Sequence, residues 1–319
     1  MSNSYKIFND KHLAAFERDG CAVVENFLSA EEVQGLRKRT SELLQSFDPH
    51  THPTVTFATG TKNGRHIGEQ YFLDSATLCS YFLEEGAITD KGLIVTPERA
   101  INKIGHGLHI VEPQFSDITH SQRVRYITEC LGYKDPRVLQ SMVICKQPGI
   151  GGAVPMHQDS TFLFTNPPSA CGFWIALEDC TLENGCLEFI PGSHRNTPIT
   201  RRFVRVTNPK DSNAATEMIA IEPISSQFLP LTNDNGEKTN VSVDTATNAN
   251  PLEQDVNCKP VEVRSGSLVL IHGQVLHRSA HNHSEHSRWI YTFHIVEGEN
   301  KYDHRNWLQM PPGQELTKL

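Results

Sequence analysis

The sequence lacks the features that mark several large classes of protein. Its 319 residues contain no apolar run long enough to cross a membrane, and its eight cysteines include no Cys-x-x-Cys pair. The formal net charge is -8 and no stripe of lysine and arginine follows the chain, which argues against a nucleic-acid-binding surface. The small basic cluster Arg201, Arg202 and Arg205 is interpreted as a solvated face. We therefore expect a globular protein that binds neither nucleic acid nor a membrane.

The scattered cysteines indicate the compartment. Several of them, such as Cys145 and Cys186, lie in apolar runs, which is typical of free buried thiols. No signal peptide is recognisable, so we expect a reducing compartment, the cytoplasm. The ending Thr-Lys-Leu differs by one residue from the Ser-Lys-Leu address and leaves the peroxisome as the alternative.

The spacing of apolar residues changes after Val138. Ser29-Ala30-Glu31-Glu32 fits a capping box and is followed by apolar residues at helical spacing, which predicts an amphipathic helix over 29–46. A further helix is expected around 116–131. Beyond Val138, turn residues separate short apolar runs, which favours a β-barrel or jelly roll. These expected strands cover 138–145, 160–164, 171–178, 186–190, 261–271 and 288–296.

Three polar segments interrupt the expected strands. No helical pattern follows Gly149-Ile150-Gly151-Gly152, so we interpret this stretch as a turn and not as a phosphate-binding loop. Glu183-Asn184-Gly185 is a second turn. Residues 207–259 are rich in Asn, Thr, Asp and Ser, and we expect a long insertion or lid there.

His157-Gln158-Asp159 offers an imidazole and a carboxylate at the start of a strand-like run. On a strand, residues i and i+2 point from the same face, roughly 6–7 Å apart, so His157 and Asp159 could converge on one ion. The pattern is common in proteins. A third ligand is therefore needed before it indicates a metal site.

The stretch from Leu268 to His294 supplies candidates for that ligand. It contains His272, His277, His281, His283, His286 and His294. If its flanking strands pair around residues 282 and 283, His277 faces Arg288 on one side of the sheet, and His272 faces Phe293. On that register His294 lies about 20 Å from Arg288, and we expect it to be a core residue or a support for the ligands. The other three histidines fall in or beside the turn, so His277 is the preferred ligand.

Two histidines, a carboxylate and an arginine match one known type of site. His157, Asp159 and His277 would form a 2-His-1-carboxylate triad, which leaves three positions of an octahedral ion open and suits non-haem Fe(II) and oxygen chemistry. A 2-oxo acid can chelate such an ion. Its distal carboxylate would then suit the bidentate guanidinium of Arg288.

Longer motifs around these residues resemble one protein family. They are His157-x-Asp159, His277 with Arg288 eleven residues later, Leu182-Glu183-Asn184-Gly185-Cys186-Leu187, Ile190-Pro191-Gly192-Ser193-His194, Ile101-Asn102-Lys103-Ile104-Gly105-His106, Lys146-Gln147-Pro148 and Arg305-Asn306-Trp307-Leu308-Gln309. Together they are similar to the phytanoyl-CoA hydroxylase superfamily of Fe(II)/2-oxoglutarate dioxygenases, over nearly the whole chain. The main departure is the 207–259 segment, which is longer than the family pattern.

The resemblance implies a fold and a domain layout. The expected fold is mainly β, a double-stranded β-helix (jelly roll) with flanking α-helices, in a single dioxygenase domain over residues 1–319. Residues 1–135 would form a mostly helical N-terminal flank, and residues 136–206 and 260–297 the jelly-roll core. Residues 207–259 would be the insertion or lid.

The resemblance also implies roles for single residues. By motif match, His157, Asp159 and His277 look like the iron ligands, and Arg288 looks like the anchor of the distal carboxylate of 2-oxoglutarate. Ser279 resembles a hydroxyl donor to that carboxylate. Lys103, Met142 and Trp174 resemble residues that line the co-substrate pocket. Without the resemblance, Lys103 would be interpreted as a surface lysine, and Met142 and Trp174 as core residues.

The implied activity is hydroxylation of a C–H bond with release of succinate and CO2. Fe(II) would be the cofactor, 2-oxoglutarate and O2 the co-substrates, and ascorbate an additional reductant. The substrate is expected to be a small molecule, and the sequence favours no oligomeric state. One alternative is a catalytically silent module that binds metal or 2-oxoglutarate. A zinc-dependent hydrolase is a weaker alternative, because the sequence has no H-E-x-x-H motif.

Overall fold

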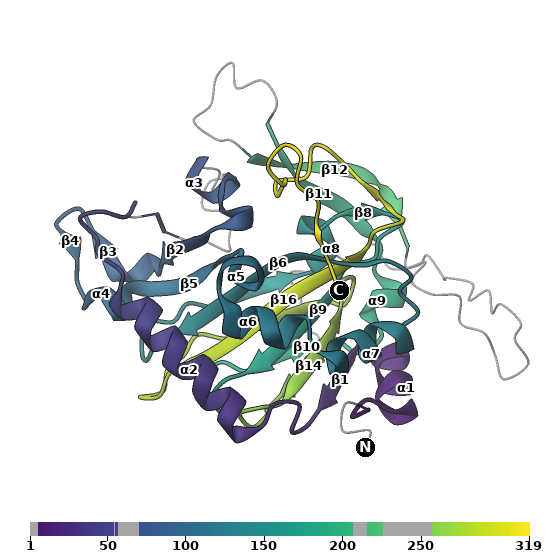
Figure 1. Cartoon of the computed structure of the whole chain (residues 1–319), viewed down its shortest axis with the longest axis horizontal. Helices are drawn as coiled ribbons and strands as arrows, with labels where there is room; N and C mark the ends of the chain where they lie inside the picture. Colours follow the sequence, from purple (N-terminus) through teal and green to yellow (C-terminus); the bar gives the residue numbers. More distant parts are fainter. Residues whose placement is uncertain (1–5, 54, 57–69, 207–215, 226–256) are drawn as a thin grey trace, which may run out of the picture.

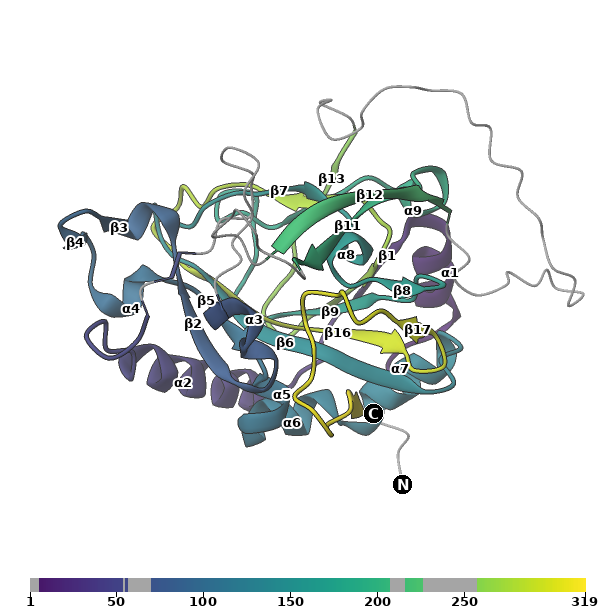
Figure 2. The same cartoon turned by 90° about the horizontal axis from the view of Figure 1, so that it is seen from above.

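Two facing sheets and a layer of helices make up the described part of the chain. The computed structural model describes residues 6–53, 55–56, 70–206, 216–225 and 257–319. The main sheet has the strand order β1-β14-β9-β16-β6-β5-β2, with β18 added beside β6, and the smaller sheet has the order β13-β10-β15-β7. In Figures 1 and 2, the helices α2, α5 and α6 cover one face of the main sheet, and β7 and β11 to β13 lie on the other side. This arrangement confirms the expected mainly β jelly roll with flanking helices, in which the sheets are not closed.

The strand bounds follow the two sheets. The main sheet contains β1 (Cys21–Val24), β2 (Cys79–Leu83), β5 (Ile101–His106), β6 (Pro136–Lys146), β9 (Cys171–Ala176), β14 (Leu268–His272), β16 (Arg288–Glu297) and β18 (Thr317–Lys318). The smaller sheet contains β7 (Val154–His157), β10 (Leu187–Phe189), β13 (Lys259–Val261) and β15 (His277–Ser279). Separate pairs are β3 (Ile88–Thr89) with β4 (Gly92–Leu93), β8 (Thr165–Asn166) with β17 (Lys301–Tyr302), and β11 (Ile199–Arg205) with β12 (Thr216–Ile224).

The helices lie mostly in the first half of the chain. They are α1 (Asp10–Asp19), α2 (Ala30–Gln45), α3 (Gln70–Leu73), α4 (Pro97–Ala100), α5 (Leu108–Val111), α6 (Pro113–Thr119), α7 (Gln122–Cys130), α8 (Asp159–Phe162) and α9 (Ser193–Asn196), with 3-10 turns at Ser75–Thr77 and Glu85–Ala87. Within the described residues, none of them has the length and apolarity that crossing a membrane requires.

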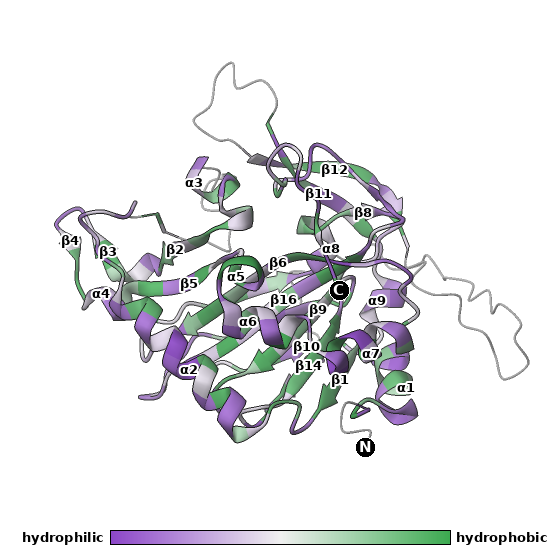
Figure 3. Cartoon of the chain, viewed as in Figure 1, coloured by the Kyte–Doolittle hydropathy of each residue, from purple (hydrophilic) through white to green (hydrophobic). Residues whose placement is uncertain are grey.

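Helix α2 confirms the amphipathic helix expected over 29–46. The Ser29 hydroxyl accepts a hydrogen bond from the backbone N–H of Glu32 (3.2 Å), and the Glu32 carboxylate accepts one from the backbone N–H of Ser29 (2.8 Å). This capping box satisfies two backbone donors at the start of the helix. The apolar stripe that follows, which includes Leu36 and Leu43, is buried. Figure 3 shows hydrophobic and hydrophilic residues alternating along α2, whereas the central strands of the main sheet are mostly hydrophobic.

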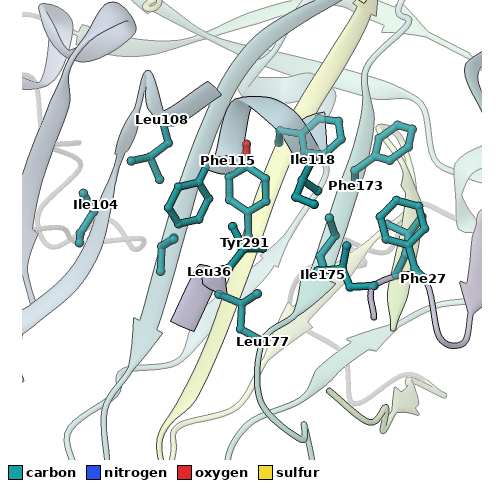
Figure 4. Packing of buried hydrophobic residues seen from close by; sticks show 14 of the residues in the cluster. Phe27, Leu36, Ile104, Leu108, Phe115, Ile118, Phe173, Ile175, Leu177 and Tyr291 are labelled. Atoms are coloured by element: carbon teal, nitrogen blue, oxygen red, sulfur yellow. The ribbon is translucent and has the colours of Figure 1, made fainter. Parts of the chain in front are cut away.

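Alternate side chains of strand β16 point to two different regions, the helix-covered core on one face and the candidate site on the other. Tyr291 and Phe293 point toward the helices, where Tyr291 packs against Phe115 of α6 with ring centroids 4.8 Å apart (Figure 4). The Tyr291 hydroxyl is hydrogen-bonded to Thr119 at 2.6 Å. Because successive residues of a strand point to opposite faces, Arg288 and the other even-numbered residues face the smaller sheet.

Several expected elements differ from the observed ones. The helix around 116–131 is divided into α6 and α7. The run 160–164 is wrong as a strand, because α8 covers residues 159–162. The N-terminal flank supplies β1, β2 and β5 to the main sheet in addition to its helices. Within the expected insertion 207–259, residues 216–224 form β12, which pairs with β11, so this part is ordered, as the apolar run that begins at Met218 indicates. Residues 207–215 and 226–256 lie outside the described residues.

The interpretation of the basic cluster as a solvated face is wrong for two of its three residues. Arg202 is 3% exposed, and its guanidinium donates to Asp303 at 2.9 Å and to Asn306 at 2.7 Å. Arg205 donates to the backbone carbonyls of Trp307 and Leu73. Arg202 and Arg205 are therefore hydrogen-bonded within the protein, mostly to the C-terminal segment that covers β11. Arg201 alone of the three is exposed.

We expect Asp303→Asn to lower the free energy of unfolding by about 3 kcal/mol, because it leaves the buried Arg202 guanidinium without its anion. Partial burial would raise the pKa of Asp303, but the hydrogen bonds from Arg202 and Arg305, together with the charge of Arg202, outweigh this effect and hold the pKa below its usual range. The contribution is therefore present above about pH 4 and is lost as the pH falls through the depressed pKa. Urea denaturation at pH 7 measures the loss.

The matched control for this variant is Glu299→Gln. Glu299 forms an exposed ion pair with Lys134 at 3.4 Å, with side chains 58% and 75% exposed. Such a pair contributes little, so the control should change stability by less than about 1 kcal/mol. Equal stabilities of the two variants would contradict the structural role of the Arg202–Asp303 pair.

Candidate metal centre

Three potential metal ligands, two from neighbouring positions and one from a distant part of the sequence, meet between the two sheets. His157 ends β7 and His277 begins β15, and the two residues are direct partners in the smaller sheet. Asp159 places its Oδ1 3.5 Å from Nε2 of His157 and 3.6 Å from Nε2 of His277. The three ligand atoms lie within 4.8 Å of one another, and the described residues contain no other cluster of this kind. The candidate ligands named from the sequence are therefore brought together.

Backbone carbonyls fix the orientation of both imidazoles. Nδ1 of His157 lies 2.8 Å from the carbonyl oxygen of Pro155, and Nδ1 of His277 lies 3.0 Å from that of Val275. A carbonyl can only accept, so each Nδ1 carries the proton and donates it. Each Nε2 therefore keeps its lone pair, directed toward Oδ1 of Asp159. This is the tautomer that a metal-binding histidine needs.

The charges of the cluster suit a divalent cation. Burial lowers the pKa of His277 to about 4, so this ring is neutral at neutral pH. Burial alone would raise the pKa of Asp159, but the neighbouring His277 and His294 rings outweigh it and hold the pKa well below its usual range. The result is two imidazole nitrogens beside one ionised carboxylate. This donor set fits Fe(II), as it does in 2-His-1-carboxylate sites generally.

Asp159 reaches the cluster from a helical turn and not from a strand. It is the first residue of α8, and the backbone N–H of Ser160 donates to the carbonyl of Gly273 at 2.7 Å. The Gln158 side chain donates to two more backbone carbonyls at 2.9 and 2.8 Å. These bonds turn the chain directly after His157. The ligands named from the i, i+2 spacing are adjacent in space, but the strand geometry expected for them is wrong.

Arg288 and His277 belong to different sheets. Strand β15 pairs with β10 and β7, whereas β16 pairs with β6 and β9. The hairpin expected around residues 282 and 283 is therefore wrong, and the partner of Arg288 is Lys146. Residues 280–287 cross between the sheets, where Asn282 fixes them by donating to the backbone carbonyls of Lys146 and His286. Arg288 consequently projects from the main sheet into the interior between the two sheets.

His294 supports Asp159 from the main sheet. Its Nε2 lies 3.3 Å from Oδ2 of Asp159, and its Nδ1 lies 3.4 Å from the side-chain nitrogen of Gln140. Because a carboxylate only accepts, Nε2 of His294 donates to it. This contact occupies the carboxylate oxygen that faces away from the two ligand imidazoles. The sequence indicated a core or supporting role for His294, but Gln140 was missed because only the pairing of β6 with β16 reveals it.

The other histidines of the 268–294 stretch lie away from the cluster. His272 is paired with Cys171 and not with Phe293, and it packs against the ring of His194 at 4.8 Å. His281 and His283 stack on each other with centroids 4.6 Å apart, in the segment between the sheets. His286 is exposed.

Arg288 is a buried cation without an anionic partner among the described residues. It is 2% exposed, and its Nε has no hydrogen-bond partner there. Its guanidinium lies 5.4 Å from the ring of Trp174, and burial lowers its pKa. A buried charge without a partner is costly, which indicates that this position receives an anion. Ser279, on the opposite sheet, is 5% exposed and completes the polar lining.

Lys103, Met142 and Trp174 also lie on the inner face of the main sheet. Trp174 and Met142 flank Thr292 on its two neighbouring strands, so the three share one row. Lys103 is 6% exposed, so the interpretation as a surface lysine is wrong. Burial lowers its pKa to about 7, against the opposing charge of Glu84. The interior between the sheets is thus rich in cations.

Comparison with known proteins yields one family. Residues 16–290 match the sequence profile described as Phytanoyl-CoA dioxygenase (PhyH). The chain is 42% identical over 308 residues to phytanoyl-CoA dioxygenase domain-containing protein 1 of Danio rerio, with 95% of each chain covered. It is 40% identical over 296 residues to the phytanoyl-CoA dioxygenase of Arabidopsis thaliana, covering 92% of this chain and 91% of that one.

Solved structures share the fold. EctD from S. alaskensis, solved with 2-oxoglutarate and 5-hydroxyectoine, is similar with a TM-score of 0.56 at 17% identity, covering 97% of this chain and 82% of that one. The epimerase SnoN, solved with Fe3+, alpha ketoglutarate and nogalamycin RO, is similar with a TM-score of 0.55 at 16% identity, covering 97% and 94%. At these identities the likeness shows the jelly-roll fold.

We expect His294→Ala to weaken binding of a divalent transition metal by about 10–100-fold, because the carboxylate of Asp159 loses the donor that orients it. Calorimetric titration of the purified chain with Co(II) or Mn(II) measures the affinity. The matched control is His286→Ala, which removes an exposed histidine of the same stretch and should leave the affinity unchanged. Equal affinities of the two variants would show that His294 does not support the centre.

Proposed function

Because the chain belongs to the phytanoyl-CoA dioxygenase family, we propose that it is an Fe(II)- and 2-oxoglutarate-dependent dioxygenase that hydroxylates a C–H bond of a small molecule and releases succinate and CO2. The observation that carries this proposal is a His-Asp-His cluster in the same interior as a buried arginine that has no anionic partner among the described residues. The cluster would provide a metal site with open positions, and the arginine would provide an anion site. A 2-oxo dicarboxylic acid needs both.

The proposed iron ligands are His157, Asp159 and His277. They would hold Fe(II) through the two histidine Nε2 atoms and Oδ1 of Asp159, while the Nδ1 atom of each histidine donates to a backbone carbonyl. When bound, the metal supplies the redox chemistry that couples oxidation of 2-oxoglutarate to oxidation of the substrate. The protein contributes the fixed tautomers, the ionised Asp159 and a site largely closed to water. O2 as the second co-substrate and ascorbate as a reductant are part of the proposal.

The proposed co-substrate site lies on the inner face of the main sheet. Arg288 would bind the distal carboxylate of 2-oxoglutarate with both arms of its guanidinium, and the Ser279 hydroxyl would donate to the same carboxylate. Lys103, Met142 and Trp174 would line the remainder of the pocket. Three buried cations, Lys103, Lys146 and Arg288, surround this space, and an anion with two carboxylates would offset their burial.

The substrate would approach beside His157. Its side chain is 24% exposed, whereas those of His277 and Asp159 are 6% and 11% exposed, so the cluster opens on the His157 side. Phe162 lies against the His157 ring with centroids 6.1 Å apart, and Phe203 lies 5.6 Å from Phe162. Phe162 is partly exposed and would offer an apolar contact to a hydrocarbon part of the substrate, whereas Phe203 is 3% exposed and supports Phe162 from the core. Arg202 and Arg205 are engaged internally and do not provide a basic entrance for a CoA ester.

The catalytically silent module is the second candidate. It would share the metal and 2-oxoglutarate sites but release no succinate. The intact set His157, Asp159, His277 and Arg288 favours the enzyme, because a binding module has no need for open metal positions beside an oriented carboxylate. The experiment that separates the two candidates is succinate formation from 2-oxoglutarate by the Fe(II)-loaded chain, screened against a library of small metabolites.

We expect Asp159→Ala to abolish succinate formation, since the variant loses the charged ligand of the centre. The decrease should be at least about 100-fold, comparable to the loss of a ligand contact worth several kcal/mol. Chromatographic measurement of succinate checks this outcome. A variant that retained 2-oxoglutarate-dependent CO2 release at the native rate would refute the ligand assignment.

We expect Arg288→Met to weaken 2-oxoglutarate binding by about 10–100-fold, because one charge-assisted bidentate contact is lost. The affinity for Co(II) should stay unchanged, since Arg288 contacts none of the three ligands in the described structure. Calorimetry with metal and then with 2-oxoglutarate separates the two effects. Unchanged 2-oxoglutarate affinity would show that the distal carboxylate binds elsewhere.

A further inference from the structure

Lys146 is a buried lysine whose ammonium lies beside the proposed carboxylate site. It is the last residue of β6, is 2% exposed, and is the direct strand partner of Arg288. Its Nζ donates to the Ser279 hydroxyl at 3.0 Å, to the carbonyl of Gly152 at 2.8 Å and to the carbonyl of Ala280. All three donors of the ammonium are therefore used. The side chain bridges the main sheet to the strand that carries His277.

Two glycine turns make the space for this side chain. A Cβ on Gly151 would collide with Cγ of Lys146, and a Cβ on Gly185 would lie 3.0 Å from its Cδ. Gly185 also has a positive φ of 79°, which disfavours other residues. These glycines belong to the Gly-Ile-Gly-Gly and Glu-Asn-Gly turns of the sequence. Their packing role here is to let the lysine stem pass between them.

The crossing segment closes over the same side chain. Asn282 is fully buried, its backbone N–H donates to the carbonyl of Gly151 at 2.9 Å, and its amide donates to the carbonyl of Lys146 at 3.0 Å. Three segments that are distant in the sequence therefore fix the position of one ammonium group. Bonding the carbonyls of Gly152 and Ala280 does not by itself require a buried lysine, since water satisfies such carbonyls at a protein surface.

The hydrogen bond to Ser279 sets the direction of the serine hydroxyl. An ammonium has only donors, so the Ser279 oxygen must accept from Lys146. Its own proton is then free to point elsewhere, so Ser279 can act as a donor to a bound ligand. A neutral acceptor at position 146 would instead accept the hydrogen bond from the Ser279 hydroxyl.

Burial disfavours the charged form of Lys146. Burial lowers its pKa to about 7, and the positive charge of Arg288 acts in the same direction. The nearby Glu84 carboxylate is already engaged by the backbone N–H of Gly152 at 2.7 Å and by the amide of Asn102 at 2.6 Å. The two adjacent cations thus favour the arrival of an anion between them.

We propose that Lys146 is a positioning residue for the dicarboxylate co-substrate, and that it acts by presenting the Ser279 hydroxyl as a donor to the distal carboxylate beside Arg288. This inference rests on the proposed function. It assigns no contact with the metal to Lys146, and it gives the two glycine turns a role in co-substrate binding.

The test uses two metal-chelating anions and the full chain loaded with Mn(II). N-oxalylglycine is an unreactive analogue of 2-oxoglutarate that keeps the distal carboxylate, whereas oxalate chelates the metal without one. We expect Lys146→Met to weaken N-oxalylglycine binding by roughly tenfold or more, as for loss of a hydrogen bond to a charged group, and to leave oxalate binding unchanged. Calorimetry measures both affinities. Lys134→Met, which removes a lysine that is 75% exposed, is the matched control and should change neither.

A second comparison separates positioning from a general structural role. In a Ser279→Ala background, Lys146→Met should cost much less N-oxalylglycine affinity than it does in the native chain, because the group through which it acts is gone. Lys146→Gln replaces the three-donor ammonium by a neutral amide and serves if the methionine variant does not fold. It should show the same selective loss.

The outcomes distinguish this inference from the proposed function. If the native chain loaded with Mn(II) binds N-oxalylglycine and both Lys146 variants bind it equally well, the role of Lys146 is refuted and the proposed function stands. Equal weakening of oxalate and N-oxalylglycine would show a purely structural role and also refute the inference. If the native chain itself binds neither anion, the proposed function fails.

Discussion

The unpaired charge of Arg288 is the constraint on which the rest of the site depends. A guanidinium that is 2% exposed and has no anion among the described residues raises the free energy of the folded protein unless a ligand offsets it. Two further buried basic side chains lie on the same face, Lys146, which is the strand partner of Arg288, and Lys103. The interior beside Arg288 is therefore suited to an anion. In the proposed function, a chelating dicarboxylate would reach from the metal to Arg288.

The alternation of side chains along β16 links this interior to the stability of the fold. Tyr291 and Phe293 pack into the helices, as Figure 4 shows for Tyr291, and this packing fixes the strand that carries Arg288 and His294 on its other face. The ligand histidines lie on the smaller sheet, so the distance between the two sheets sets the distance from metal to anion site. Changes in the helical core should therefore be transmitted to the site through one strand.

The sequence was sufficient for the elements and residues that local chemistry specifies. The capping box predicted α2. The motifs named His157, Asp159 and His277, which the structure brings together, and Lys103 and Trp174, which lie on the inner face of the main sheet. It was insufficient where contacts join distant strands. The assumed hairpin placed His277 beside Arg288 in one sheet, whereas residues 280–287 cross between sheets, and periodicity cannot reveal such a crossing. Gln140 and the position of Lys146 depend on the pairing of β6 with β16, which no local pattern encodes. The compartment remains a prediction from the sequence.

The joint metal and co-substrate site is tested most directly by an anaerobic titration of the purified chain with Fe(II) and 2-oxoglutarate, followed by visible absorption. We expect a weak charge-transfer band that appears only when both are present, because the keto acid would chelate an iron held by His157, Asp159 and His277. The band should be saturable in 2-oxoglutarate and absent from Asp159→Ala. If the native chain gives no band although it binds Fe(II), the joint metal and co-substrate site does not exist.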